Sequence, residues 1–171
     1  YVKNVTAAFR QEIDRFIADT PQYRRASSGK TTLAFTPDLN KSFNRGHTRY
    51  FLSGRGEKVG AIDTPKSLGK AIGTVTMQGP GFFRMQGDRV RNGDGLCFFA
   101  PSGALSGFRV NRVEQDRIYP NTMEALTVGQ RLYRNWDHEF FRALEKASAV
   151  RRVGVFLRFQ QSETRISLEV T

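Results

Sequence analysis

The chain has 171 residues, 39% of them hydrophobic and 14 of them Phe, which is enough to bury the core of one ordinary domain. Its net charge is +11 and its isoelectric point is about 10.4, which favours contact with polyanions such as RNA, DNA or an anionic surface. The alternative is a basic but inert surface. The single cysteine, Cys97, excludes an internal disulfide and cannot by itself hold a thiolate metal cage or an iron–sulfur cluster.

The sequence contains no apolar run of membrane-spanning length and no signal peptide, so we expect a cytoplasmic protein with no membrane partner. The charge is uneven along the chain. Residues 1–58 contain eleven Lys and Arg against five Asp and Glu, residues 59–135 ten against six, and residues 136–171 six against five. The N-terminal half is therefore the better place to look for an anionic partner.

Apolar residues at three- and four-residue spacing predict a helix over residues 2–19, and its apolar face contains Val2, Val5, Phe9, Ile13, Phe16 and Ile17. Thr20 ends it, because a residue that precedes proline is disfavoured in the α region. The helix begins at the first residue without a cap, so we expect the chain to be cut from a longer protein. A short strand is expected at Thr31–Phe35.

A loop rich in cations follows at residues 41–55. Asn44 and Gly46 both tolerate positive φ, so the backbone can turn sharply there. Such a loop would project three arginines, Arg45, Arg49 and Arg55, and cations on a positioned loop usually serve recognition. A solvated basic connector is the alternative.

Short apolar runs separated by glycine-containing turns continue from Lys58 to Arg134. The runs are Val59–Ile62, Ala71–Met77, Phe82–Met85, Leu96–Phe99, Phe108–Val113 and Leu132–Tyr133. Six short strands separated by such turns predict a small closed barrel or a sandwich. Asn92-Gly93 is a tight-turn signal, and Cys97 is expected to be a small buried hydrophobe in a strand.

A second helix is expected from Asp137, whose carboxylate can cap the first turn, with Glu139 near the positive end of the helix dipole. Two strands follow, Val150–Phe159 and Thr164–Val170, joined by residues 160–163. The predicted fold class is mainly β with a minor α+β character. It is a small six-stranded barrel with flanking N-terminal and C-terminal helices and a terminal β-hairpin.

Four pieces of the barrel segment follow one another in a recognisable order, Gly73-Thr74-Val75, Gly87-Asp88-Arg89-Val90, Gly107-Phe108-Arg109-Val110 and Val128-Gly129-Gln130-Arg131-Leu132-Tyr133. This pattern of strands and turns resembles the second domain of translation elongation factors. The resemblance implies a translation-factor-like barrel and implies nothing about chemistry.

Further pieces span nearly the whole chain: Tyr1-Val2-x-x-Val5-Thr6-x-x-Phe9-Arg10, Ser42-Phe43-Asn44-Arg45-Gly46-x-Thr48, Gly93-Asp94-Gly95-Leu96 and Gly129-Gln130-x-Leu132-Tyr133-Arg134. In this order they resemble the domain of unknown function that follows the catalytic domain in U32 collagenase-like peptidases. The resemblance implies that residues 1–21 end the preceding catalytic domain and that 22–57 form a basic glycine loop region. Residues 58–135 would be the barrel, and 136–171 a helix with a truncated hairpin.

Members of that family are named as peptidases, whereas better-understood relatives hydroxylate ribosomal or transfer RNA with an iron–sulfur cluster in the catalytic domain. The cysteines that bind this cluster have no counterpart here, since Cys97 stands alone. The resemblance therefore implies a non-catalytic accessory domain with no cofactor of its own. Its partners would be RNA and the preceding catalytic domain of the same polypeptide.

The residues themselves predict no catalytic centre. Only His47 and His138 could act as histidine bases, and the sequence has no Gly-x-Ser-x-Gly elbow. The run Asp137-His138-Glu139 has the composition of a metal site, but adjacent helical residues point in different directions. We expect a capped, solvated helix start there and no metal.

Arginines and aromatic residues are the candidates for RNA contact, because guanidinium groups pair with phosphates and aromatic rings stack on unpaired bases. The candidate residues are Asn44, Arg45, Gly46, Thr48, Arg49, Tyr50 and Arg55 in the loop, and Arg84, Arg89, Arg91, Arg109 and Arg112 in the barrel. A solvated rim is the alternative for the arginines, and core packing is expected for every Phe.

The sequence thus favours an accessory domain that positions an RNA substrate for modification or hydroxylation, or supports the catalytic domain. Two alternatives stay open on the sequence. One is the substrate-recognition domain of a genuine collagenase-like protease, and the other is a structural spacer.

Overall fold

The computed structural model describes residues 1–56, 59–62, 64, 66–123 and 126–171. Its helices are α1 (Val2–Asp19), the 3₁₀ turn η1 (Leu39–Lys41) and α2 (His138–Glu145). The strands of the barrel are β2 (Lys70–Gly79), β3 (Phe82–Gly87), β4 (Gly95–Phe99), β5 (Leu105–Glu114), β6 (Arg117–Pro120) and β7 (Arg131–Trp136). Outside the barrel lie β1 (Lys30–Leu33), β8 (Ala149–Arg152), β9 (Leu157–Gln161) and β10 (Ile166–Val170).

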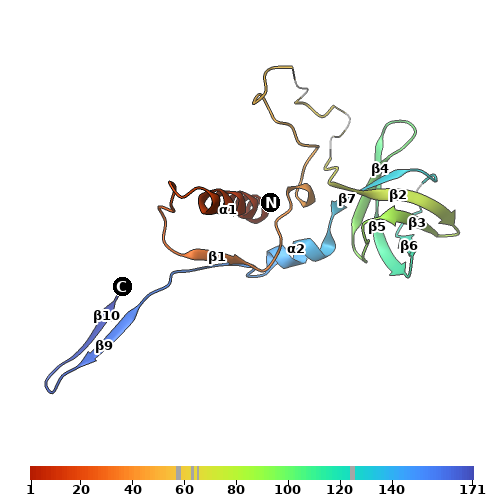
Figure 1. The fold of residues 1–171 in the computed structure, drawn as a ribbon. Coiled ribbons are helices and arrows are strands. Elements are labelled where there is room, and N and C mark those ends of the chain that lie inside the picture. Colours follow the sequence, from red (N-terminus) through yellow and green to blue (C-terminus); the bar gives the residue numbers. More distant parts are fainter. Residues whose placement is uncertain (57–58, 63, 65, 124–125) are drawn as a thin grey trace.

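The barrel closes in the order β2-β3-β6-β5-β4-β7, with antiparallel pairing between neighbours (Figure 1). Alternate residues point inward, and the largest buried side chains are Phe83, Phe98, Leu96 and Leu132, each at most 1% exposed. Cys97 is buried as predicted, and burial raises the pKa of its thiol to about 12. The mainly β fold class and the small closed barrel are confirmed.

One strand of the barrel differs from the prediction. The run Val59–Ile62 is not a strand, and Ile62 is 94% exposed. Its place in the barrel is taken by β6, whose Ile118 is buried opposite Phe83. The sequence of β6 carries little strand signal, because the strand has four residues and a single buried apolar side chain, Ile118. Lys58, where the predicted barrel segment begins, lies outside the described residues.

Helix α1 has the predicted bounds, with Thr20 as its C-cap, but it packs with an unexpected face. Asn4 and Ala7 are buried, whereas several residues of the apolar face are exposed, namely Val2, Phe9, Ile13 and Phe16. The Asn4 Nδ2 donates to the Asp38 carbonyl (2.7 Å) and to Ser42 Oγ (2.6 Å), and its Oδ1 accepts from the Asp38 N–H (3.0 Å). These hydrogen bonds fasten α1 to η1.

The segment predicted as one strand from Val150 to Phe159 forms two strands. β8 pairs with β1, which confirms the short strand expected near Thr31, and β9 pairs with β10 as the predicted terminal hairpin. Figure 1 shows this hairpin projecting away from the barrel, with α1, β1 and α2 between them. Among the described helices, none is long and apolar enough to cross a membrane.

Candidate nucleic-acid interface

The loop between η1 and β2 is held at its base by Asn44. Its Nδ2 donates to the carbonyls of Asn40 (3.0 Å) and Ser42 (2.9 Å), and its Oδ1 accepts from the Gly46 N–H (3.3 Å). The Asn44 carbonyl accepts from the Leu68 N–H (2.9 Å), which joins the two ends of the loop. Asn44 therefore shapes the loop through hydrogen bonds of its side chain and backbone.

Of the two residues that tolerate positive φ at the start of this loop, one adopts it. Gly46 has a φ of 100°. Asn44 does not adopt positive φ, because its side chain makes the turn by hydrogen bonding to the backbone instead. Positive φ also occurs at Tyr50 (53°) and at Gly54 (112°).

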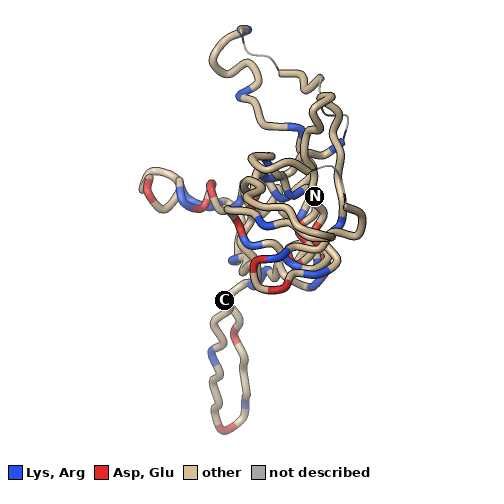
Figure 2. Tube along the Cα trace, turned by 90° about the vertical axis from the view of Figure 1, so that its right-hand side faces the viewer, with Lys and Arg blue, Asp and Glu red and all other residues tan. Residues whose placement is uncertain are grey.

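The loop carries its cations away from the rest of the molecule, as Figures 1 and 2 show. Its arginines are exposed, and the Arg45 guanidinium lies 5.6 Å from the centre of the Phe43 ring. The rings of Tyr50 and Phe51 are 4.4 Å apart and both exposed, and the Tyr50 N–H donates to Thr48 Oγ1. The predicted loop residues, including Arg49 and Arg55, therefore share one protruding segment.

The predicted arginines of the barrel lie on different parts of its surface. Three of them are held by carboxylates: Arg84 by Asp116 (3.1 Å), Arg112 by Glu114 (3.2 Å) and Arg91 by Glu139 of α2. Arg89 and Arg109 are exposed. Figure 2 shows Lys and Arg dispersed over the barrel and along the loop, so the predicted residues do not form one continuous patch.

A surface groove of about 530 Å³ lies at one end of the barrel. It brings together two of the predicted cations with two acidic residues, so its lining includes Arg89, Arg91, Asp88 and Asp116. Asp88 also pairs with Lys70 of β2 at 2.9 Å. Because cations and carboxylates are mixed there, the groove offers no uniform positive surface to a polyanion.

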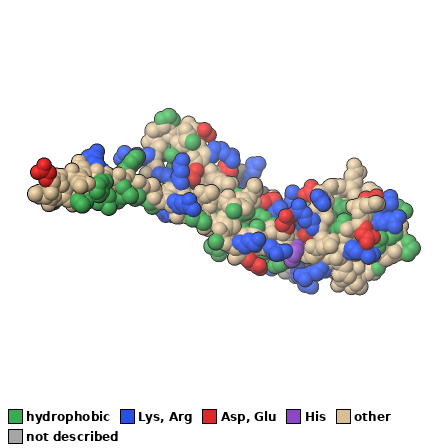
Figure 3. Space-filling view, turned by 90° about the horizontal axis from the view of Figure 1, so that it is seen from below, with side chains coloured by type: hydrophobic (Ala, Val, Ile, Leu, Met, Phe, Trp, Pro, Cys, Tyr) green, Lys and Arg blue, Asp and Glu red, His purple; other side chains and the backbone are tan. Residues whose placement is uncertain are grey.

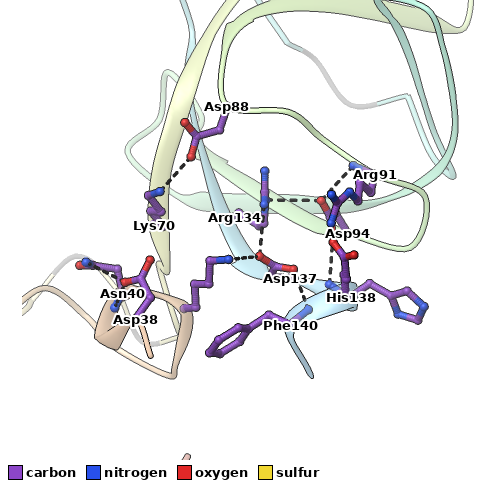
Figure 4. Close-up of polar contacts among 12 residues, drawn as sticks. Asp38, Asn40, Lys70, Asp88, Arg91, Asp94, Arg134, Asp137, His138 and Phe140 are labelled. Atoms are coloured by element: carbon purple, nitrogen blue, oxygen red, sulfur yellow. Dashed lines mark hydrogen bonds and ion pairs between the residues drawn. The ribbon is translucent and has the colours of Figure 1, made fainter. Parts of the chain in front are cut away.

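Buried acidic residues join the barrel to α2 (Figure 4). Asp94 is 1% exposed, and its carboxylate accepts from the backbone N–H groups of Arg91 (3.0 Å) and His138 (3.0 Å). Arg134 of β7 links Asp94 to Asp137, with Nε 3.4 Å from the first carboxylate and Nη1 3.3 Å from the second. The Gly-Asp-Gly-Leu motif therefore has a structural role at the start of α2.

Asp137 caps α2 as predicted. Its Oδ1 accepts from the Phe140 N–H (3.0 Å), and Lys41 Nζ of η1 lies 2.8 Å from its Oδ2. Burial raises the pKa of Asp137, but the hydrogen bonds from Lys41 and Phe140 and the charge of Arg134 outweigh it and hold that pKa below its ordinary 3.8. In the part of the chain that the structure describes, no three His, Cys, Asp or Glu side chains are grouped to hold a metal ion.

The expectation that every Phe packs in the core is wrong. Several are exposed, namely Phe9, Phe16, Phe43, Phe51, Phe156 and Phe159. Phe82 is half-buried beside Tyr119 on the outside of the barrel, their ring centres 5.8 Å apart. Strand alternation is the signal that predicts this position: Phe83 faces the core, so Phe82 must face outward.

No protein-family model matches this chain, and no solved structure matches it. Across 181 aligned positions, which cover the whole chain, it is 36% identical to the 23S rRNA 5-hydroxycytidine C2501 synthase of Escherichia coli (strain K12). The chain spans 28% of the length of that protein. It is therefore similar to one part of an enzyme that modifies ribosomal RNA.

Proposed function

We propose that this chain is a non-catalytic accessory domain that positions RNA for an RNA-modifying enzyme of the U32 type. The catalytic domain would belong to the same polypeptide. The observation that carries the proposal is the similarity of the whole chain to one part of a 23S rRNA 5-hydroxycytidine synthase. Because the chain spans 28% of that protein, the reaction and the ribosomal RNA substrate belong to the proposal too.

Charge and loop geometry support contact with RNA. The net charge of +11 attracts a polyanion, and guanidinium groups match the geometry of phosphate oxygens. Asn44 joins the base of the loop to Leu68, so the loop arginines are presented from a closed base, and they lose less freedom on binding than arginines of an open linker. The exposed rings of Tyr50 and Phe51 add surfaces on which unpaired bases can stack.

The polar groups at the junction of the barrel and α2 support the accessory role. Each acidic side chain at this junction is already bound within the fold: Asp94 and Asp137 accept backbone hydrogen bonds, and Glu139 pairs with Arg91. These carboxylates are therefore poorly placed to act on a substrate. The only cysteine of the sequence, Cys97, cannot supply the thiolates that an iron–sulfur cluster needs. The chain therefore does not fit such a cluster, and the proposal assigns the reaction to the catalytic domain.

Two exposed apolar surfaces support contact with that catalytic domain. One is the stripe on α1 formed by Val2, Phe9, Ile13 and Phe16. The other is one face of the β9–β10 hairpin, green at the left of Figure 3, with Leu157, Phe159, Ile166, Leu168 and Val170. A two-stranded hairpin is marginally stable in water unless its apolar face is covered. In this proposal the catalytic domain packs against both apolar surfaces, because the larger part of the similar synthase lies outside the segment that matches this chain.

The affinity for RNA as a function of salt tests the proposal. Fluorescence anisotropy of a labelled single-stranded RNA should show affinity falling steeply as salt rises, with a slope of about −0.7 for each phosphate contacted. The double substitution Arg45→Ala and Arg49→Ala removes two phosphate contacts and should reduce the magnitude of that slope by about 1.4. The matched control is Arg158→Ala with Arg165→Ala, which removes two cations from the hairpin, and it should leave the slope unchanged.

The possible outcomes separate the three functions. Absence of RNA binding, or an affinity that does not respond to salt, would overturn the RNA role and favour a structural spacer. Peptide cleavage by the chain that one substitution abolishes would favour an intrinsic peptidase. RNA binding that the loop substitutions leave unchanged would remove the loop from the interface.

A further inference from the structure

Two arginines on the outer wall of the barrel flank a pair of aromatic rings. Arg112 of β5 pairs across the sheet with Tyr119 of β6, and its guanidinium lies 4.3 Å from the centre of the Tyr119 ring. The Tyr119 ring is 5.8 Å from that of Phe82 on β3, and the Arg117 guanidinium lies 4.9 Å from the centre of the Phe82 ring. We call these four residues the arginine–aromatic ladder.

The barrel fixes the ladder on its outside. The inward neighbours of Phe82 and Tyr119 are Phe83 and Ile118, which are buried in the core and pair with each other across β3 and β6. Phe82 lies over the bare backbone of Gly79 on β2, where an added Cβ would come within 2.4 Å of the ring. Both aromatic rings are therefore held by neighbouring strands, β3 and β6, and β5, which carries Arg112, lies on the other side of β6 (Figure 1).

The charges around the ladder orient its arginines and leave an excess of cations. Glu114 holds Arg112 at 3.2 Å, and Asp116 holds Arg84 at 3.1 Å. The strands thus carry four arginines, Arg84, Arg109, Arg112 and Arg117, against two carboxylates, Glu114 of β5 and Asp116 of the β5–β6 turn. This wall combines flat groups with net positive charge.

We propose that the arginine–aromatic ladder is a stacking site for unpaired bases of RNA. Unpaired bases stack on aromatic rings and on guanidinium planes, whereas the bases of a duplex are already stacked on each other. The neighbouring Arg84 and Arg109 would hold the phosphates of the same strand. The inference deepens the proposed function and rests on it, since it takes RNA as the ligand and adds that this site selects unpaired segments.

A substitution that conserves charge tests the stacking. Arg112→Lys with Arg117→Lys keeps both cations and removes both guanidinium planes. For the 171-residue chain, we expect the affinity for a labelled single-stranded RNA to fall about fivefold or more, since the loss of stacking on one base weakens binding by at least that factor. The slope of affinity against salt should not change, because the number of neutralised phosphates is the same. The matched control, Arg158→Lys with Arg165→Lys on the hairpin, should leave the affinity unchanged.

A second variant tests the aromatic half of the ladder. Tyr119→Leu should lower the affinity for single-stranded RNA about fivefold or more and leave the affinity for a duplex of equal length unchanged. Phe16→Leu is the matched control, because Phe16 also belongs to an exposed aromatic pair, with Tyr23 at 5.5 Å, far from the barrel. Thermal melting of each variant verifies that the barrel is folded.

Four results would overturn the stacking site, and they differ in whether the proposed RNA role survives. Equal affinity for single-stranded and duplex RNA, or unchanged affinity in both ladder variants, would remove the ladder and leave the proposed RNA role intact. Equal losses in the ladder variants and in their controls would also remove it. Failure of the unsubstituted chain to bind either RNA would overturn both the ladder and the proposed function.

Discussion

Asp94 and Asp137 are acidic residues that a strongly basic chain keeps buried, and each joins segments far apart in the sequence. The Asp94 carboxylate accepts hydrogen bonds from the backbone N–H of Arg91, in the turn between β3 and β4, and from that of His138 in α2, 44 positions away. Asp137 meets Lys41 of η1 and Arg134 of β7. These contacts hold the barrel, α2 and η1 together, and η1 is the element from which the basic loop begins.

Removal of Asp94 should therefore destabilise the whole fold. In Asp94→Ala, Arg134 loses one of its carboxylates and two backbone N–H groups lose their acceptor. Loss of one partner of a buried ion pair costs about 3 kcal/mol of the free energy of unfolding. Urea unfolding followed by circular dichroism measures this cost. The control is Asp116→Ala, whose partly exposed pair with Arg84 should contribute less than about 1 kcal/mol. An equal cost for both variants would contradict the prediction.

Asp137 should make stability depend on acid pH. Its pKa is held below the ordinary 3.8 in the folded chain, so the carboxylate stabilises the fold fully at pH values above 3.8. This stabilisation is lost as the pH falls through the lowered folded pKa. Urea unfolding between pH 7 and pH 2 should show that loss in the unsubstituted chain and a flatter profile in Asp137→Asn. The same slope in both proteins would show that other groups cause the acid sensitivity.

Among the elements, β2 and β3 approach each other closely at paired glycines. Gly73 lies opposite Gly87, and both have positive φ, 152° and 145°. A Cβ on Gly87 would lie 2.0 Å from the Ile72 carbonyl oxygen, a contact that the backbone cannot accommodate without moving.

Gly87→Ala is therefore expected to lower the free energy of unfolding by about 2 kcal/mol or more, through strain and displacement of the β2–β3 pairing. Chemical denaturation gives the value. Gly60→Ala is the control, because nothing lies within 4 Å of a Cβ there, and its effect should stay within about 0.5 kcal/mol. If Gly87→Ala were as mild as the control, the close approach would not contribute to barrel stability.

Periodicity in the sequence predicts elements where several apolar residues face one way. It places α1 and most of the barrel strands, because each repeats a pattern over several residues. It fails at β6, where one inward Ile118 between two barrel neighbours is sufficient, and at Val59–Ile62, where an apolar run has no sheet to join. It also cannot indicate which face of α1 is buried, since Asn4 docks through hydrogen bonds that require η1 to be in place.

The candidate site is less predictable than the fold, because side-chain partners are set by tertiary structure. The sequence indicates that residues 41–55 form a cationic loop, which the structure shows protruding. It does not indicate that Arg84 and Arg91 are held by carboxylates, since their partners come from a turn after β5 and from α2. The Phe82–Tyr119 pair is hidden for the same reason, because β6 has to be recognised first.

At the scale of the whole molecule, burial is concentrated at one end. The closed barrel contains the main core cluster, while the β9–β10 hairpin at the other end buries little apolar surface (Figure 3). Stability should follow the same gradient, because local opening is easiest where few apolar contacts are lost.

Hydrogen exchange measured by mass spectrometry should reveal this gradient. Amides of β3, β4 and β7 should exchange at least about a thousandfold more slowly than those of β9 and β10, since barrel strands open only with the global unfolding of a domain. The amides of the hairpin are protected by hydrogen bonds between β9 and β10 and by the backbone hydrogen bonds between Phe156 and Thr171. Equal protection of hairpin and barrel would contradict this prediction. In the presence of the proposed catalytic domain, protection from exchange should rise at α1 and at the hairpin and stay constant in the barrel. The reason is that α1 and the hairpin expose the apolar faces against which that domain would pack.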